Sequence, residues 1–101
     1  MTQYLIATSV LEAIARGSLA DDARLRVHST LPFARPHAMD VGVEGQECRV
    51  TAHLDARLGE NLPALAEEAR FKIGRALARM TGLTVTSVDI VFAGVFPSDS
   101  R

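Results

Sequence analysis

Cysteine and large aromatic residues are scarce in this chain, and their scarcity excludes or weakens several classes of protein. Cys48 is the only cysteine among 101 residues, so a disulfide framework within the chain is excluded. The chain has no tryptophan and one tyrosine, which leaves few rings for stacking against the bases of a nucleic acid. The formal net charge is −1, so no overall basic excess attracts a phosphate backbone.

Long apolar runs and catalytic motifs are also missing. No segment reaches the roughly 20 apolar residues that a membrane-spanning helix needs. Residues 1–17 lack the basic start and apolar run of a secretory signal. The chain has no G-x-S-x-G nucleophile turn and no glycine-rich phosphate loop. We therefore expect a cytoplasmic protein that is not an enzyme, with no cofactor, no metal and no small-molecule substrate.

The residues that are present predict one small globular domain. Hydrophobic residues make up 48% of the chain and charged residues 23%, which is typical of a folded domain rather than a disordered one. We expect residues 1–97 to form this single domain. Pro97 ends the last apolar run, so residues 98–101 are expected to be a short flexible tail.

Alternation of apolar and polar residues predicts the strands. The clearest alternation runs from Cys48 to Leu58, with one face apolar and the other polar, which is typical of an antiparallel sheet with one face in solvent. Together with residues 39–44, this segment is expected to form a hairpin. Three further runs predict strands at residues 4–6, 25–27 and 85–96.

The last predicted strand has two apolar faces. One face is expected to hold Val88, Ile90, Phe92 and Phe96. The other is expected to hold Val85, Ser87, Asp89, Val91, Ala93 and Val95. A sheet needs only one apolar face for its core, so the second face is a candidate contact surface.

Helical spacing of apolar residues predicts two helices. The first is expected at about residues 10–20, with Ser9 and Glu12 in the spacing of a capping box. The second is expected to run from an Asn61 N-cap to about Thr81, with Gly82 as a left-handed C-cap. Its apolar stripe comprises Leu62, Ala66, Ala69, Ile73, Ala76 and Met80, widened by Leu65 and Leu77.

The order of these segments predicts the fold class. They follow one another as strand, helix, strand, hairpin, long helix and strand, which is the order β-α-β-β-β-α-β. A helix with one apolar stripe and a sheet with one apolar face bury these surfaces against each other. We therefore predict an α+β domain, with a small, mainly antiparallel sheet and two helices packed on one face.

One pair of residues has the chemistry of a metal or acid–base site. His53 and Asp55 are two apart on a predicted strand and therefore share a face. A metal site needs three or four convergent ligands, and no other ligand lies at a useful spacing. We therefore favour the interpretation that His53 and Asp55 lie on a solvated sheet face over the interpretation that they form the site of a metal-dependent enzyme. Cys48 is expected on the opposite, apolar face as a buried structural thiol.

The remaining functional residues are expected on surfaces. Phe71 comes two residues after Ala69 and lies roughly opposite the apolar stripe of the long helix. Its ring either packs under a loop, such as the one that contains Phe33, or is an exposed anchor for another chain. The later part of the helix is basic. We predict a partner or self-association surface that comprises Phe71, Lys72, Arg75, Arg79, Phe33, Val91 and Val95.

The second half of the chain also contains a distinctive sequence element. Met80-Thr81-Gly82-Leu83 is followed by the pattern V-x-I-x-x-x-G-V from Val88 to Val95. With the strand at 48–58 and the helix around 62–78, this element resembles the alkaline-shock-protein family of bacterial envelope stress response proteins. The first half matches through Ile6 and the helical segment 10–15. The resemblance implies a non-enzymatic, cytoplasmic protein that self-assembles or is held near the membrane by a membrane-anchored partner.

Two functions follow from these observations. The favoured one is a non-enzymatic envelope stress response protein, acting as a self-associating scaffold or adaptor near the cytoplasmic face of the membrane. The alternative is a small nucleic-acid-binding module that uses Lys72, Arg75 and Arg79. Glu67 and Glu68 dilute this basic patch and few aromatic residues accompany it, so nucleic acid is the less favoured partner.

Overall fold

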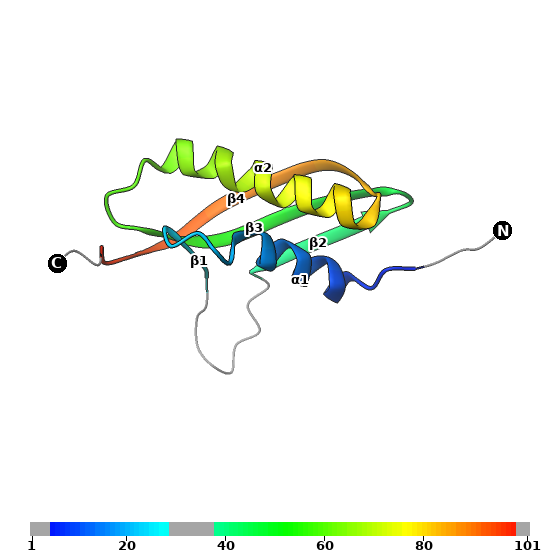
Figure 1. Cartoon of the computed structure of the whole chain (residues 1–101), viewed down its shortest axis with the longest axis horizontal. Helices are drawn as coiled ribbons and strands as arrows, with labels where there is room; N and C mark the ends of the chain where they lie inside the picture. The colour runs from blue at the N-terminus through cyan, green and yellow to red at the C-terminus, as the bar shows by residue number, and fades with distance from the viewer. Residues whose placement is uncertain (1–4, 29–37, 99–101) are drawn as a thin grey trace.

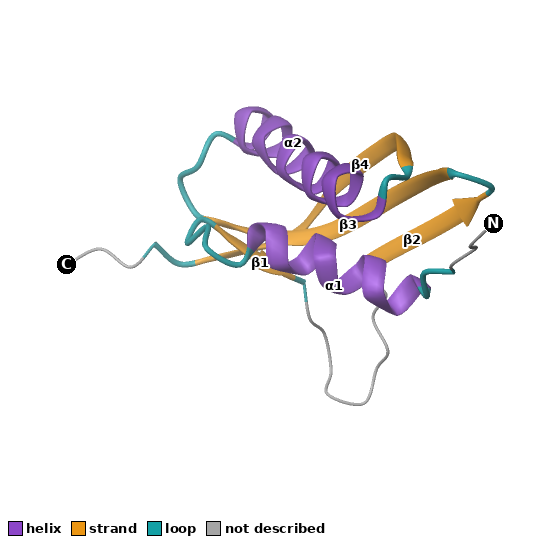
Figure 2. Cartoon of the chain, turned by 45° about the vertical axis from the view of Figure 1, so that its right-hand side comes forward, coloured by secondary structure: helices purple, strands orange, loops and turns teal. Residues whose placement is uncertain are grey.

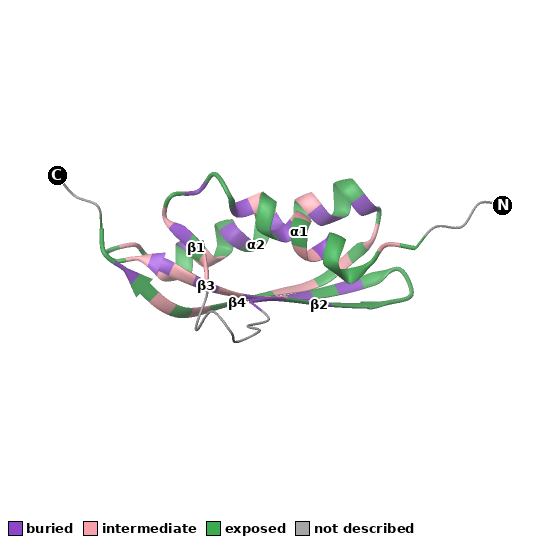
Figure 3. Ribbon diagram, turned by 90° about the horizontal axis from the view of Figure 1, so that it is seen from below, coloured by how far each residue is buried: buried purple, intermediate pink, exposed green. Residues whose placement is uncertain are grey.

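The fold is known from a computed structural model that describes residues 5–28 and 38–98 (Figure 1). The predicted α+β class is confirmed. Both helices pack on the same face of one sheet, as the side view in Figure 3 shows. The elements are α1 (Thr8–Leu19), β1 (Leu25–Val27), β2 (Met39–Glu44), β3 (Glu47–Arg57), α2 (Leu62–Thr81) and β4 (Thr84–Phe96).

β3 is the central strand of the sheet. β1 and β2 pair antiparallel with successive parts of one edge of β3, at Leu25–Ala56 and at Met39–Ala52. β4 pairs parallel with the other edge along its whole length. The parallel direction follows from α2, because a chain that leaves β3 and crosses over through a helix returns in the same direction (Figure 2).

The core lies between the two helices and the inner face of β3. The alternation predicted for β3 is confirmed, because every second residue is buried: Cys48, Val50, Ala52, Leu54 and Ala56. Burial raises the pKa of the Cys48 thiol, which therefore stays protonated and unreactive at neutral pH. This agrees with the predicted structural role of Cys48.

The predicted strand at residues 4–6 is wrong for Leu5 and Ile6, which lie outside any strand; Tyr4 is outside the described residues. Ile6 packs against the core just before α1 begins. A three-residue apolar run can bury its side chains in this way without pairing with another strand. The apolar character of the run therefore did not show whether its backbone forms a strand.

The predicted capping box of α1 is also wrong. The helix begins at Thr8, its N-cap is Ala7, and no side chain caps it. Ser9 therefore lies inside the first turn, two positions too late to act as the cap. The buried face of α1 consists of Leu11, Ala15 and Leu19.

Both predicted caps of α2 are confirmed. The Asn61 side chain accepts a hydrogen bond from the amide of Ala64 at 3.1 Å, and Gly82 has a φ of 77°. The predicted apolar stripe is wrong at Met80, which is 70% exposed. The buried row advances in steps of four and ends at Thr81 rather than at Met80: Leu65, Ala69, Ile73, Leu77 and Thr81.

Two bulges change the direction of side chains along β4. The register with β3 shifts twice, so that Thr86 and Ala93 have no paired residue on β3. Each extra residue reverses the alternation of faces. Val95 pairs with Ala56 on the helix side, whereas Phe96 pairs with Arg57 on the uncovered side. The predicted faces of Val85, Val95 and Phe96 are therefore wrong.

Candidate interaction surface

Phe71 lies on the outer flank of α2 and is 65% exposed. The guanidinium of Arg75 lies over its ring, 5.9 Å from the centroid, which is within the range of a cation–π contact. Of the two arrangements that the sequence left open for Phe71, the structure has the exposed one. Phe33, the predicted loop partner, lies outside the described residues.

An open groove of about 670 Å³ separates this flank of α2 from the first half of β4. Glu67, Phe71 and Arg75 line it from the helix, and residues 84–88 line it from the strand. Gly74 faces Val88 across this junction, because a Cβ atom at Gly74 would lie 3.9 Å from Cγ2 of Val88, an ordinary contact distance. In Figure 1 the start of β4 curves out beyond α2, so its outer edge is not covered by the helix.

β4 is an edge strand with little protection. It spans 13 residues and pairs only with β3 among the described residues. Asp89 is its only charged residue. Natural edge strands are usually short, bulged or charged, because unpaired N–H and C=O groups otherwise attract another strand. β4 has two bulges, at Thr86 and Ala93, but it is long and nearly uncharged, and its first half lies beside the exposed ring of Phe71.

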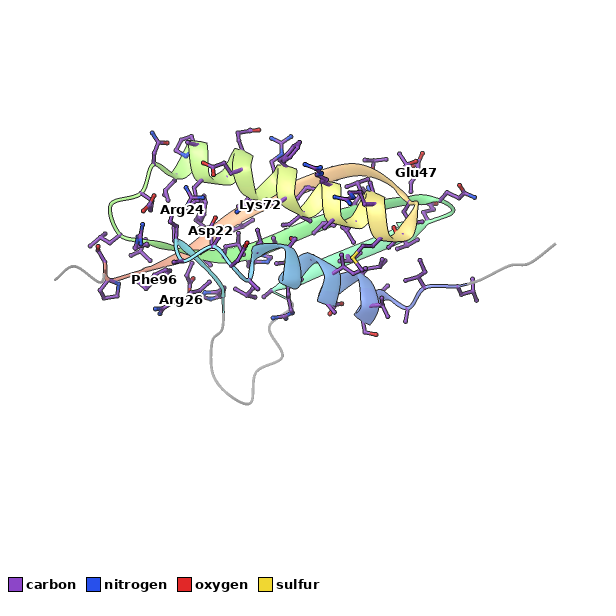
Figure 4. The ribbon with its side chains drawn as sticks, viewed as in Figure 1. Asp22, Arg24, Arg26, Glu47, Lys72 and Phe96 are labelled. Atoms are coloured by element: carbon purple, nitrogen blue, oxygen red, sulfur yellow. The ribbon has the colours of Figure 1, made fainter. Side chains whose placement is uncertain are left out.

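Lys72 lies on the opposite flank of α2 and is not part of this surface. Its Nζ donates to Oδ2 of Asp22 at 3.1 Å. Arg24 donates to both carboxylate oxygens of Asp22, with Nε to Oδ1 at 2.8 Å and Nη2 to Oδ2 at 2.7 Å. Arg24 also pairs with Glu68 at 2.9 Å. Figure 4 shows Asp22, Arg24 and Lys72 together where the end of α1 meets α2.

The ion pairs around Asp22 shift the pKa values of three groups. The Arg24 guanidinium, with help from Lys72, holds the pKa of Asp22 well below its usual range, although burial opposes this effect. The same contacts raise the pKa of Arg24. Arg24 also lowers the pKa of Glu68. The cluster joins the turn after α1 to α2 and therefore stabilises the fold rather than presenting free charge.

The seven predicted surface residues therefore do not form one patch. Phe71 and Arg75 lie together, and Arg79 is exposed further along α2. Val91 and Val95 are both exposed, but the second bulge places them on opposite faces of β4. The groove and the open edge of β4 were not predicted, because they depend on which strand lies at the edge of the sheet.

The face of the sheet that points away from the helices contains the predicted His53–Asp55 pair. Asp55 does not contact His53; its Oδ1 lies 2.7 Å from Nδ1 of His28. His53 Nδ1 is buried and has no hydrogen-bond partner among the residues that the structure describes. No group of three metal-ligating side chains occurs within residues 5–28 and 38–98. Sequence spacing missed His28 because it reaches Asp55 across the β1–β3 pairing.

The same face ends in a second cation–π contact. The guanidinium of Arg26 lies 3.9 Å from the centroid of the Phe96 ring, and Figure 4 shows the two side chains close together. This contact covers Phe96, which would otherwise be an exposed ring on the helix-free side of the sheet. It follows from the bulge that turned Phe96 to this side.

Comparison with known proteins adds no relative to these observations. No protein-family model, no curated protein and no solved structure matches the chain. Within the described residues, no helix is long and apolar enough to cross a membrane. The surface formed by α2 and β4 must therefore be interpreted from its own residues.

Proposed function

We propose that this chain is a non-enzymatic envelope stress response protein that acts as a self-associating scaffold or adaptor near the cytoplasmic face of the membrane. The proposal combines the resemblance of residues 48–95 to the alkaline-shock-protein family with one structural observation. That observation is the exposed Phe71 ring, with Arg75 above it, beside the open edge of β4.

Phe71 and Arg75 are residue types that suit a contact between proteins. Aromatic residues and arginine are enriched at protein interfaces, where they often provide much of the binding energy. Single exposed apolar side chains are common on protein surfaces, but Phe71 lies beside both Arg75 and the edge of β4, so the ring, the cation and the strand edge together form a candidate contact surface. The neighbouring strand edge supplies backbone groups that a second protein can pair with.

The alternative, a nucleic-acid-binding module, has less support. Its three predicted residues were Lys72, Arg75 and Arg79, but Lys72 is held by Asp22 on the other flank of α2. Arg75 and Arg79 remain, with Phe71 as the one ring near them. A single-strand site needs a longer basic track and several stacking rings.

We expect Phe71→Asp to abolish concentration-dependent association in sedimentation velocity while leaving the fold intact. The substitution places a charge in a contact that excludes water. Because the ring is exposed, the free energy of unfolding should change by no more than about 0.5 kcal/mol. Leu58→Asp is the matched control, since Leu58 is 61% exposed but lies in the turn after β3, and it should still associate.

Three results would contradict all or part of this assignment. If Phe71→Asp unfolds the protein, the ring belongs to the core and not to an interface. If the wild type binds single-stranded DNA or RNA with an affinity that falls steeply as salt rises, the nucleic-acid alternative gains instead. A wild type that stays monomeric at every concentration removes self-association and leaves only an adaptor with a different partner.

A further inference from the structure

The two edges of the sheet differ in their ability to accept another strand. One edge is divided between β1, of three residues, and β2, which carries Asp40 and Glu44. The other edge is β4, which is continuous over 13 residues and has Asp89 as its only charge. Charge and short length are the usual protections of an edge strand. The β4 edge has the least of both, and its bulges at Thr86 and Ala93 leave residues 87–92 as a regular stretch between them.

The flank of α2 beside this edge has a charge pattern with a centre. Glu67, Phe71 and Arg75 recur every four residues and so form one row along the helix. Glu67 is also paired with Arg70 of its own helix, at 2.8 Å on the exposed surface. The acidic and basic ends lie equally far from Phe71, about 6 Å along the axis on either side. A second identical helix, running antiparallel and centred on Phe71, would place its Arg75 opposite Glu67 and its Glu67 opposite Arg75.

A two-fold axis that passes near Phe71 of α2 can also pass through Val88 of β4. Val88 lies below this part of α2, since it approaches Gly74 and lines the groove with Phe71. An antiparallel pair of β4 strands centred on Val88 places Asp89 opposite Ser87 of the second copy, so that like charges do not face each other. One two-fold axis therefore serves both the strand and the helix.

We propose that the occupant of this surface is a second copy of the chain, bound by a two-fold contact. β4 pairs antiparallel with β4 of the other copy around Val88, and the two α2 flanks meet at Phe71 with Glu67 opposite Arg75. This inference rests on the self-association proposed above and specifies its geometry. The equal spacing of Glu67 and Arg75 from Phe71 makes the row complementary to a second copy of itself. Binding of a peptide or of an unrelated protein would not depend on this equal spacing.

The charge row allows a test by exchange of charges. Glu67→Arg alone brings two arginines together at each end of the contact, and Arg75→Glu alone brings two glutamates together. Each variant alone should dimerise at least about tenfold more weakly than the wild type, because the symmetry repeats the repulsion. A one-to-one mixture of the two variants restores opposite charges at both ends and should recover the wild-type affinity. The measurement is sedimentation velocity at low ionic strength, where exposed charges are least screened.

Arg79→Glu is the control for this experiment. It makes the same change of charge on the same helix, but the two-fold axis places residue 79 opposite Pro63, which has no charge. This variant should dimerise as the wild type does. Single variants that dimerise normally, or a mixture that remains monomeric, would overturn the proposed contact while leaving self-association through another surface. A monomeric wild type would overturn both.

A cross-linking experiment tests the strand pairing separately. Ser87→Cys and Asp89→Cys face each other only between copies, and the native Cys48 is buried and does not compete. Oxidation of a mixture of the two variants should give a disulfide-linked dimer on a non-reducing gel, well above the amount from either variant alone. A mixture that sediments as a dimer but does not cross-link would overturn the antiparallel pairing of β4.

Discussion

Asp22 connects separate parts of the chain through a single carboxylate. Its side chain is 5% exposed, lies just after α1, and accepts hydrogen bonds from Arg24 and Lys72. A buried carboxylate without partners would cost several kcal/mol, so these two cations are what allow Asp22 to be ionised there. From the sequence, Asp22 lies just after the helix predicted at about residues 10–20. The partners could not be predicted, because Lys72 is 50 residues away.

We expect Asp22→Asn to lower the free energy of unfolding by about 2 kcal/mol at pH 7. The pKa of Asp22 is lower in the folded protein than its unfolded value of about 3.9. Its stabilisation is therefore complete above that value and is lost as the pH falls below it towards the folded pKa. Urea denaturation of both proteins from pH 7 to pH 2 measures this. A difference between them that stays constant over the whole range would refute the ionic role of Asp22.

His28 and Asp55 show a second limit of prediction at the scale of residues. The period-two pattern of β3 placed His53 and Asp55 on one face, and the structure confirms that face. It did not indicate that Asp55 would contact His28, which directly follows β1, rather than His53. Contacts within one strand follow from spacing, whereas contacts between strands require the register, which depends on the whole sheet.

The helices and strands themselves were largely predictable, because local chemistry determines their ends. Asn61 and Gly82 limit α2 as expected, since a side-chain acceptor and a left-handed glycine satisfy the end groups of a helix. The hairpin of β2 and β3 followed from alternation. The bulges at Thr86 and Ala93 were not predictable, because each arises from pairing with β3 and leaves no local signal in β4.

Two glycine substitutions in and beside α2 should have opposite effects. Gly74→Ala should raise the free energy of unfolding by about 0.5–1 kcal/mol, because alanine is the better helix former and the added Cβ makes an ordinary contact with Val88. Gly82→Ala should lower it by about 1 kcal/mol, because its φ of 77° is unfavourable for any residue with a Cβ. Thermal or urea unfolding measures both. If both substitutions changed the free energy of unfolding in the same direction, this account of the two glycines would be contradicted.

Among the described residues, the sheet has one face covered by helices and one face without helices, and its two edges are unequal. The face without helices is polar along β3 (Figure 3). The arrangement of helices on one face could be predicted from the apolar stripes. The identity of the open edge could not, because the sequence alone did not show that β4 would pair with β3 and lie outside it.

Dimerisation through β4 should make thermal stability depend on concentration. Only the folded protein presents the paired surface, so mass action favours folding as concentration rises. Roughly a hundredfold increase in protein concentration should raise the unfolding midpoint of the wild type by about 5 °C. The unfolding midpoint of Phe71→Asp should not change with concentration. Differential scanning calorimetry over this range is the measurement. An equal shift in both proteins would show that the stabilising contact lies elsewhere.

The division of the far edge between β1 and β2 also limits how large an assembly can grow. A two-fold contact through β4 occupies the same strand in both copies and closes on itself. Each dimer then presents only split edges of the β1 and β2 kind, with Asp40 and Glu44 on the longer strand. Addition of further copies strand by strand therefore stops at two. A scaffold of higher order would have to be built from dimers, with a partner that bridges them.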